Sequence, residues 1–142
     1  MTLGYVDVFL RLGAAVLSGA LIGFDREIRD KPAGLRTLTL VSLGSAVFTL
    51  TALDSGIGVD STSRVVQGII TGIGFLGAGT IIRGKTEESV RGLTTAASVW
   101  LSAAIGVACG LAYWSLVLIA SLFGLLVLAL EGLEARIKSA VK

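Results

Sequence analysis

The chain has 142 residues, of which 54% are hydrophobic and only 15% are charged, and its mean hydropathy is +0.87. A soluble domain of this length would need far more charge to cover its surface, so the composition predicts one helical membrane domain. The sequence has no histidine and a single cysteine, Cys109, which excludes histidine-based zinc or acid–base chemistry and an intrachain disulfide. We expect Cys109 to be packing, and no cofactor is indicated.

Five hydrophobic segments approach the roughly 20 apolar residues that cross a bilayer. They are residues 6–24, 35–53, 65–82, 93–111 and 114–131. The last two come from one uncharged stretch, Leu93–Leu130, which as a single helix would be about 57 Å long, so we expect a turn near Gly110–Trp114. The first segment has neither a basic leader nor a cleavage site, so we expect a retained helix rather than a signal peptide.

The basic residues predict the orientation of these segments. Ten of the 12 Lys and Arg residues fall in the first loop, the third loop and the tail, all on one side of a five-span arrangement. The positive-inside rule then places the amino terminus outside and the carboxy terminus in the cytoplasm. Since the basic residues report topology, nucleic-acid binding is not indicated.

The first two segments resemble the next two at an offset of 58 residues. Gly19-Ala20 matches Gly77-Ala78, and Gly34-Leu35 matches Gly92-Leu93. Both hairpins would run in the same direction, so we predict an all-α integral membrane fold of two parallel-repeat hairpins and a fifth helix.

Glycine is concentrated in the third segment, at Gly68, Gly72, Gly74, Gly77 and Gly79. Small residues every fourth position let helix backbones touch, so the first interpretation is helix packing; replacement of Gly72 or Gly106 by leucine should then disrupt assembly. The alternative is a break in this helix that lines a wet cavity. The fifth segment has few small residues, so we expect it to face lipid or a partner subunit.

Polar residues on the basic side form the main candidate site. In the first loop, a helix continued to Asp30 would place three pairs of opposite charge at i,i+4. These pairs are Asp25 with Arg29, Arg26 with Asp30, and Glu27 with Lys31. Arg36 opens the next helix, where a carboxylate or an anionic lipid headgroup would suit it. Thr94 is a possible helix cap. The cluster comprises Asp25, Arg26, Glu27, Lys31, Arg36, Thr37, Arg91, Thr94 and Thr95. It is either a salt-bridged interfacial turn or the frame of a cytoplasmic vestibule.

The outer side carries a smaller polar set: Asp54, Asp60, Arg64 and Gln67. The two aspartates flank a short Gly/Ser loop and could hold a hydrated Mg²⁺ weakly, although a solvated loop is the simpler interpretation. Asp7 and Arg11 stand at i,i+4 and should form a pair near the outer interface. The sequence offers no nucleophile–base pair and no phosphate-binding loop, so we do not expect an enzyme.

Four ordered segments carry a resemblance to a known family. They are Gly23-Phe-Asp-Arg-Glu27, Lys31-Pro-Ala-Gly-Leu-Arg-Thr37, Gly72-Ile-Gly-Phe-Leu-Gly-Ala-Gly79 and Arg91-Gly-Leu-Thr-Thr-Ala-Ala97 with Trp100. Together they resemble the membrane domain of the MgtC/SapB family of bacterial inner-membrane proteins, from about residue 12 to residue 110. Asp25 stands where that family often has glutamate, and we expect the protein to lack the soluble carboxy-terminal domain of longer members.

The resemblance implies a multi-pass protein of the bacterial inner membrane. It also implies a role in magnesium homeostasis and growth at low Mg²⁺, with virulence in pathogens, and a membrane partner such as ATP synthase. Two functions stay open. One is a non-enzymatic regulator that binds other membrane machinery, which small-residue packing would suit. The other is a transporter or channel for a cation such as Mg²⁺, which the glycines and carboxylates would suit. We also expect a homodimer in the lipid bilayer.

Overall fold

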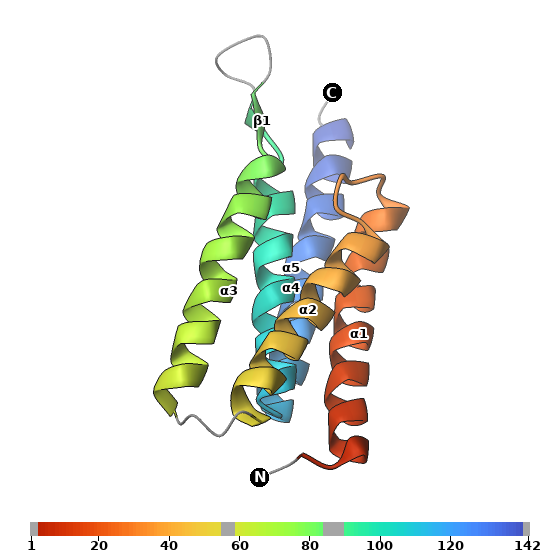
Figure 1. Cartoon of the computed structure of the whole chain (residues 1–142). Coiled ribbons are helices and arrows are strands. Elements are labelled where there is room, and N and C mark those ends of the chain that lie inside the picture. Colours follow the sequence, from red (N-terminus) through yellow and green to blue (C-terminus); the bar gives the residue numbers. More distant parts are fainter. Residues whose placement is uncertain (1–2, 55–58, 84–89, 141–142) are drawn as a thin grey trace.

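The computed structural model describes residues 3–54, 59–83 and 90–140, and this part of the chain forms five α-helices and one two-stranded hairpin. The helices are α1 (Tyr5–Ile28), α2 (Leu35–Asp54), α3 (Val59–Gly79), α4 (Leu93–Gly110) and α5 (Trp114–Ala140). Strands β1 (Ile82–Arg83) and β2 (Val90–Arg91) pair antiparallel. The helices lie side by side and alternate in direction, so the α1–α2 turn, the hairpin and the end of α5 share one end (Figure 1). We call it the basic end, because these segments hold most of the Lys and Arg residues of the sequence.

All five predicted segments are helical, and the predicted turn after Gly110 is confirmed. Ala112 takes a left-handed conformation there, with φ of 57°, and α5 begins at Trp114. The limits of α3 differ from the prediction, since this helix begins at Val59 and therefore includes two residues that were placed before it, Asp60 and Arg64. An aspartate in the first turn is favoured by the helix dipole, which helps to explain the earlier start.

The short hairpin was not predicted. Helix α3 ends at Gly79 rather than Ile82, and both the backbone N–H and the hydroxyl of Thr80 donate to the carbonyl of Gly77, which closes the last turn. The β-branched residues that follow favour extended backbone, and Ile82 pairs with Arg91. Within α3 itself the helix is continuous, so the alternative of a break at the glycines is wrong.

Three of the described helices, α1, α2 and α4, are long and apolar enough to cross a membrane. In α5 the apolar part is the shorter stretch Trp114–Leu130. Helix α3 falls outside this set because its first turns carry Asp60, Arg64 and Gln67 among several hydroxyl residues. The five-span arrangement, its orientation and the parallel repeat therefore stay predictions.

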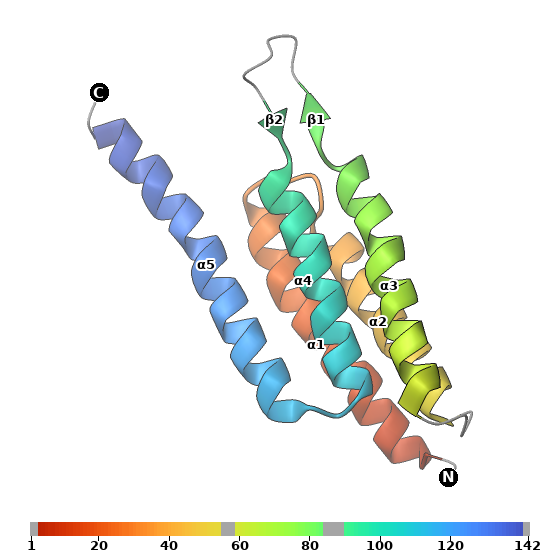
Figure 2. The same cartoon turned by 90° about the vertical axis from the view of Figure 1, so that its left-hand side faces the viewer.

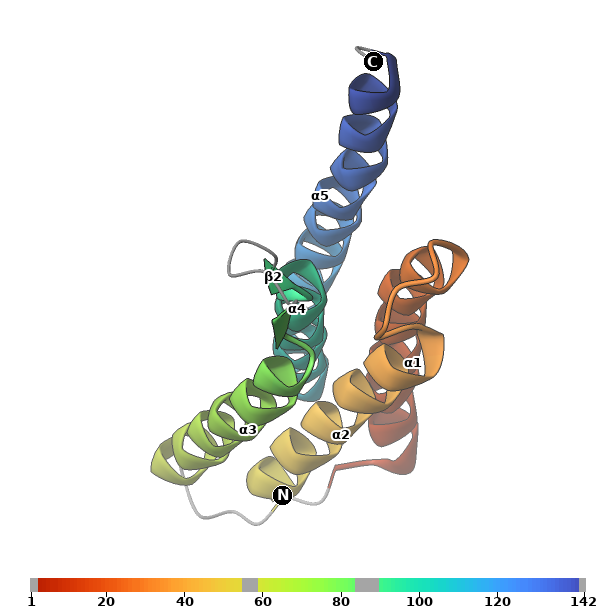
Figure 3. The same cartoon turned by 90° about the horizontal axis from the view of Figure 1, so that it is seen from above.

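Helix α4 occupies the centre and contacts each of the other four helices (Figure 3). It packs most closely with α2, and α2 packs closely with α1, in both cases through small residues as the sequence predicted. A Cβ atom on Gly19 would lie 2.8 Å from the carbonyl oxygen of Leu38, and one on Gly106 would overlap the backbone of Ser42. The hydroxyl of Ser102 donates to the same Leu38 carbonyl at 2.7 Å. These contacts fix α1, α2 and α4 as a close-packed unit.

Helices α3 and α5 lie outside this unit, and α5 leans away from it toward the carboxy terminus (Figure 2). Over residues 114–130 of α5, the exposed side chains are mostly large and apolar, among them Leu118, Phe123 and Val127. The glycines of α3 do not serve helix packing within the chain: a Cβ atom would meet nothing within 4 Å at Gly68, Gly72, Gly74 and Gly79, and at Gly77 it would make an ordinary contact with Ala96. The predicted packing role of Gly72 is therefore wrong within the single chain, and its role in assembly with another chain stays a prediction.

The two kinds of glycine should respond differently to a large side chain. We expect Gly106→Leu to separate α4 from α2, because the leucine would occupy the position of the Ser42 backbone, and to abolish a monodisperse, folded protein in detergent. Size-exclusion profile and apparent Tm would measure this. Gly74→Leu is the matched control and should fold normally, since space is open there; equal behaviour of the two variants would contradict the packing described above.

Candidate functional site at the basic end

A buried arginine joins three of the sequence segments singled out above. Arg26 lies on α1 and is 1% exposed. Its Nε donates to the carbonyl oxygen of Ala33 at 3.2 Å, in the α1–α2 turn, and its Nη2 donates to Oγ1 of Thr95 at 2.5 Å, on α4. The guanidinium therefore ties α1, the turn and α4 together at one point. Its burial and these two bonds show that Arg26 points inward, and the predicted continuation of the helix to Asp30 is wrong because α1 ends at Ile28.

The two carboxylates beside Arg26 have local partners. Asp25 accepts from Nε of Arg29 at 3.0 and 3.1 Å and forms the predicted ion pair with it, which is confirmed. Glu27 reaches across the turn, where Oε2 accepts the backbone N–H of Leu35 at 2.9 Å. Glu27 thus caps the first turn of α2, a position where negative charge is also favoured by the helix dipole. A side chain at Gly34 would displace that carboxylate.

Arg36 does not pair with either carboxylate, in contrast to one of the two expectations for it. It is exposed, and in the part of the chain that the structure describes it has no hydrogen bond or ion pair. Together with Thr37 it borders a polar depression of about 560 Å³, whose other walls are Glu27, Asp30, Lys31, Pro32 and Gly34. The predicted cluster is therefore divided between a buried part around Arg26 and this open depression.

The start of α4 lies at the same end, as predicted from the matched segments, but its cap is different. The cap residue is Gly92, with φ of 94°, and no side chain caps the helix. Thr94 is exposed and is not the cap, whereas Thr95 is buried and accepts from Arg26. Arg91 is exposed on the strand before it.

At the opposite end a second arginine links the same two helices. Arg11 pairs with Asp7 at 2.7 Å, as predicted, and its Nη1 also donates to the carbonyl of Gly110 at 2.8 Å. A cation at the carboxy-terminal end of α4 is favoured by the helix dipole. The predicted outer set is spread out: Asp54 accepts the N–H of Leu3, and the exposed side chains of Asp60, Arg64 and Gln67 lie on α3. The loop residues 55–58 lie outside the described part of the chain.

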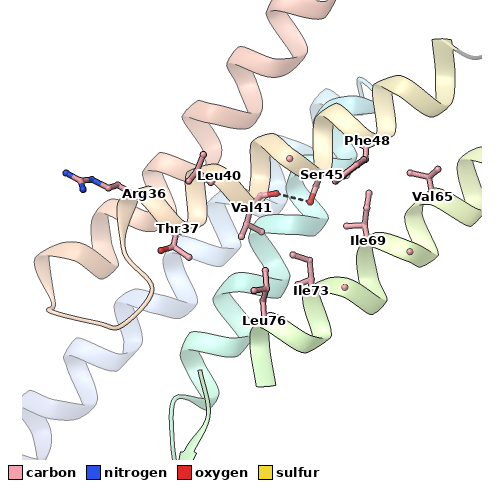
Figure 4. Close-up of a pocket in the computed structure, with 13 residues that line it drawn as sticks. Arg36, Thr37, Leu40, Val41, Ser45, Phe48, Val65, Ile69, Ile73 and Leu76 are labelled. Carbon is pink, nitrogen blue, oxygen red and sulfur yellow. Dashed lines mark hydrogen bonds between the residues drawn. The ribbon is translucent and has the colours of Figure 1, made fainter. Parts of the chain in front are cut away.

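A groove runs along α2 and α3, with a volume of about 800 Å³ (Figure 4). Its walls are apolar or small along most of its length, and Arg36 and Thr37 stand at one end; the lining residues are Arg36, Thr37, Leu40, Val41, Gly44, Ser45, Phe48, Val65, Gly68, Ile69, Gly72, Ile73 and Leu76. Two of the five predicted glycines of α3, Gly68 and Gly72, therefore face this groove, while the other three do not line it.

Sequence reasoning found Arg26 and Thr95 but not that they meet. A signal was present: the buried face of α1 runs through Ala15, Gly19 and Ile22 at helical spacing, and Arg26 continues that face. The carbonyl acceptors of Ala33 and Gly110 carry no sequence signal, because every residue has a carbonyl group.

The long apolar helices, their close small-residue packing and the buried polar contacts that join them indicate a helical membrane protein. The family model described as MgtC matches residues 12–135. The chain belongs to the MgtC family.

Three relatives illustrate the range of similarity. Protein SrpB of Synechococcus elongatus is 43% identical over 136 residues, which cover 88% of this chain and 75% of SrpB. Protein MgtC of Salmonella typhimurium is 53% identical over 102 residues, covering 72% of this chain and 42% of that protein. Protein MgtC of Brucella abortus is 49% identical over 120 residues, covering 84% and 49%. The chain thus spans about half or less of the MgtC proteins. No solved structure matches.

Loss of the buried arginine should destabilise the fold. We expect Arg26→Gln to lower the free energy of unfolding by about 2–4 kcal/mol, because the shorter side chain cannot serve both Ala33 and Thr95 and leaves buried acceptors without a donor. The apparent Tm in detergent would measure this. Arg29→Gln is the control and should change it by only about 0.3–0.5 kcal/mol, since the pair with Asp25 is a partly exposed i,i+4 ion pair. Similar losses in both variants would contradict the role given to Arg26.

Proposed function

We propose that this chain is a non-enzymatic, multi-pass protein of the bacterial inner membrane that acts in magnesium homeostasis and adaptation to low Mg²⁺ by binding and regulating other membrane machinery. Family membership supports the biological setting. The proposed orientation places the basic end in the cytoplasm.

One observation carries the regulatory part of the proposal: the carboxylates of Asp25 and Glu27 already have local partners, while large apolar side chains of the helices face outward. Asp25 is paired with Arg29, and Glu27 holds the start of α2. An apolar groove of about 800 Å³ lies on the side of the bundle. These features suit a protein that presents surfaces to a membrane partner.

Cation transport is the second candidate. Glu27 and Asp30 border the depression at the basic end, where carboxylate oxygens could attract a hydrated Mg²⁺. The regulator stays ahead because Oε2 of Glu27 accepts the Leu35 N–H and Asp25 already has a cationic partner.

Two measurements on the intact chain separate these candidates. In proteoliposomes, we expect Mg²⁺ influx equal to that of protein-free vesicles. In a bacterium deleted for its own family member, we expect the chain to restore growth at low Mg²⁺ and to change ATP-driven proton pumping by inverted membrane vesicles, ATP synthase being the partner that the family resemblance suggests. The Gly106→Leu variant should lose both cellular effects, and Gly74→Leu should keep them.

Mg²⁺ influx above the background that disappears in an Asp25→Asn/Glu27→Gln double variant, with insertion unchanged, would overturn the regulatory proposal in favour of a cation conduit.

The homodimer expected from the sequence belongs to the same proposal and predicts twice the mass of one chain in light scattering.

A further inference from the structure

The polar depression and the apolar groove are neighbours at the start of α2. Arg36 and Thr37 border both of them. One surface therefore changes, over about one helical turn from Arg36 to Leu40, from charged residues of the α1–α2 turn to apolar residues of α2 and α3. A ligand that covers both parts must itself be polar at one end and apolar along the rest.

The groove offers an occupant almost no hydrogen-bonding group. The hydroxyl of Ser45 is already committed to the carbonyl of Val41 at 2.9 Å (Figure 4). Gly44, Gly68 and Gly72 have open space where a side chain would be, so the groove is wide at these positions. Its remaining walls are aliphatic or aromatic, which suits a hydrocarbon chain.

The end of the groove favours an anion. Arg36 is exposed, and Figure 4 shows its guanidinium beyond the end of the groove and pointing away from α3. The positive end of the α2 dipole lies at the same place, since α2 begins at Leu35. Lys31, Asp30 and Glu27 also border the depression. The carboxylate of Glu27 is already bonded to the Leu35 N–H, so the attraction for an anion rests on Arg36. A cation at a helix amino terminus is itself disfavoured, so an anion there would relieve that repulsion as well.

We propose that this surface binds a glycerophospholipid, with its phosphate at Arg36 and the start of α2 and an acyl chain along the α2–α3 groove. The phosphate gives Arg36 the anionic partner that it does not have within the described part of the chain, and the acyl chain matches the groove. The proposal does not depend on the regulatory function, because lipid binding can be measured on the purified chain alone.

Native mass spectrometry of the whole chain in detergent tests the phosphate contact. The probes are phosphatidylglycerol and a diacylglycerol with the same acyl chains. We expect phosphatidylglycerol to bind with about fivefold lower Kd, the effect of one well-placed arginine near a membrane surface. Arg36→Gln should remove this preference. Arg91→Gln, which removes another exposed cation at the same end outside the two lining sets, should keep it.

A second pair of variants tests the groove. Gly72→Leu places a side chain into open space on the groove wall, so the protein should fold while its affinity for both lipids falls at least about fivefold. Gly74→Leu has equally open space but does not line the groove, and it should bind lipid as the unchanged chain does. Equal apparent Tm values for the two variants establish that folding is not the cause.

Three results would overturn the proposal. The first is lipid binding by Gly72→Leu that equals that of Gly74→Leu. The second is a preference for phosphatidylglycerol that survives in Arg36→Gln. The third is a Gly72→Leu variant that changes the number of chains in the complex while lipid binding is unchanged, which would assign the groove to a second copy of the chain.

Discussion

The fold depends on one buried guanidinium group. A charge as deep as that of Arg26 is tolerated only where hydrogen bonds replace its hydration, and the Ala33 carbonyl and the Thr95 hydroxyl contribute to that replacement. Since these acceptors lie on the α1–α2 turn and on α4, their positions cannot vary independently. The cap that Glu27 gives to α2 lies beside the same junction, and farther along the helices α4 approaches α2 closely through Gly106.

The groove exists because α3 packs less closely on the bundle than α1, α2 and α4 pack on one another. Helices α1, α2 and α4 bring backbone against backbone, so no room remains between them. Helix α3 contacts α4 through Gly77 and Ala96 at ordinary distance, and the groove lies between α3 and α2. Glycines that shorten the distance between backbones in one place therefore leave empty volume in another, and the same residue type has two opposite effects within one chain.

Much of this arrangement could be predicted from the sequence, because hydropathy and small-residue spacing are local signals. They located all five helices, the turn after Gly110 and the faces of α1 and α4 that pack. These local signals failed for Gly72. Small residues at every fourth position indicate that close packing is possible, but they do not show where the neighbouring helix lies. The inward turn of Arg26 was missed for a related reason: surface pairing at i,i+4 and burial against Thr95 use the same donor groups, and only the position of α4 decides between them.

The two arginines of α1 also bear on the order in which the chain is made. Ala33 follows Arg26 within seven residues, but Thr95 comes 69 residues later, and Gly110 follows Arg11 by 99. Helices α1 and α2 emerge during synthesis well before α4, so each guanidinium group spends that interval without its distant partner. Such groups are unfavourable in hydrocarbon, and near a membrane surface they can remain hydrated. Helices α1 and α2 should therefore enter the bilayer without a fixed position. They reach their final depth and tilt only when α4 arrives, so α4 is the element that completes the close-packed unit.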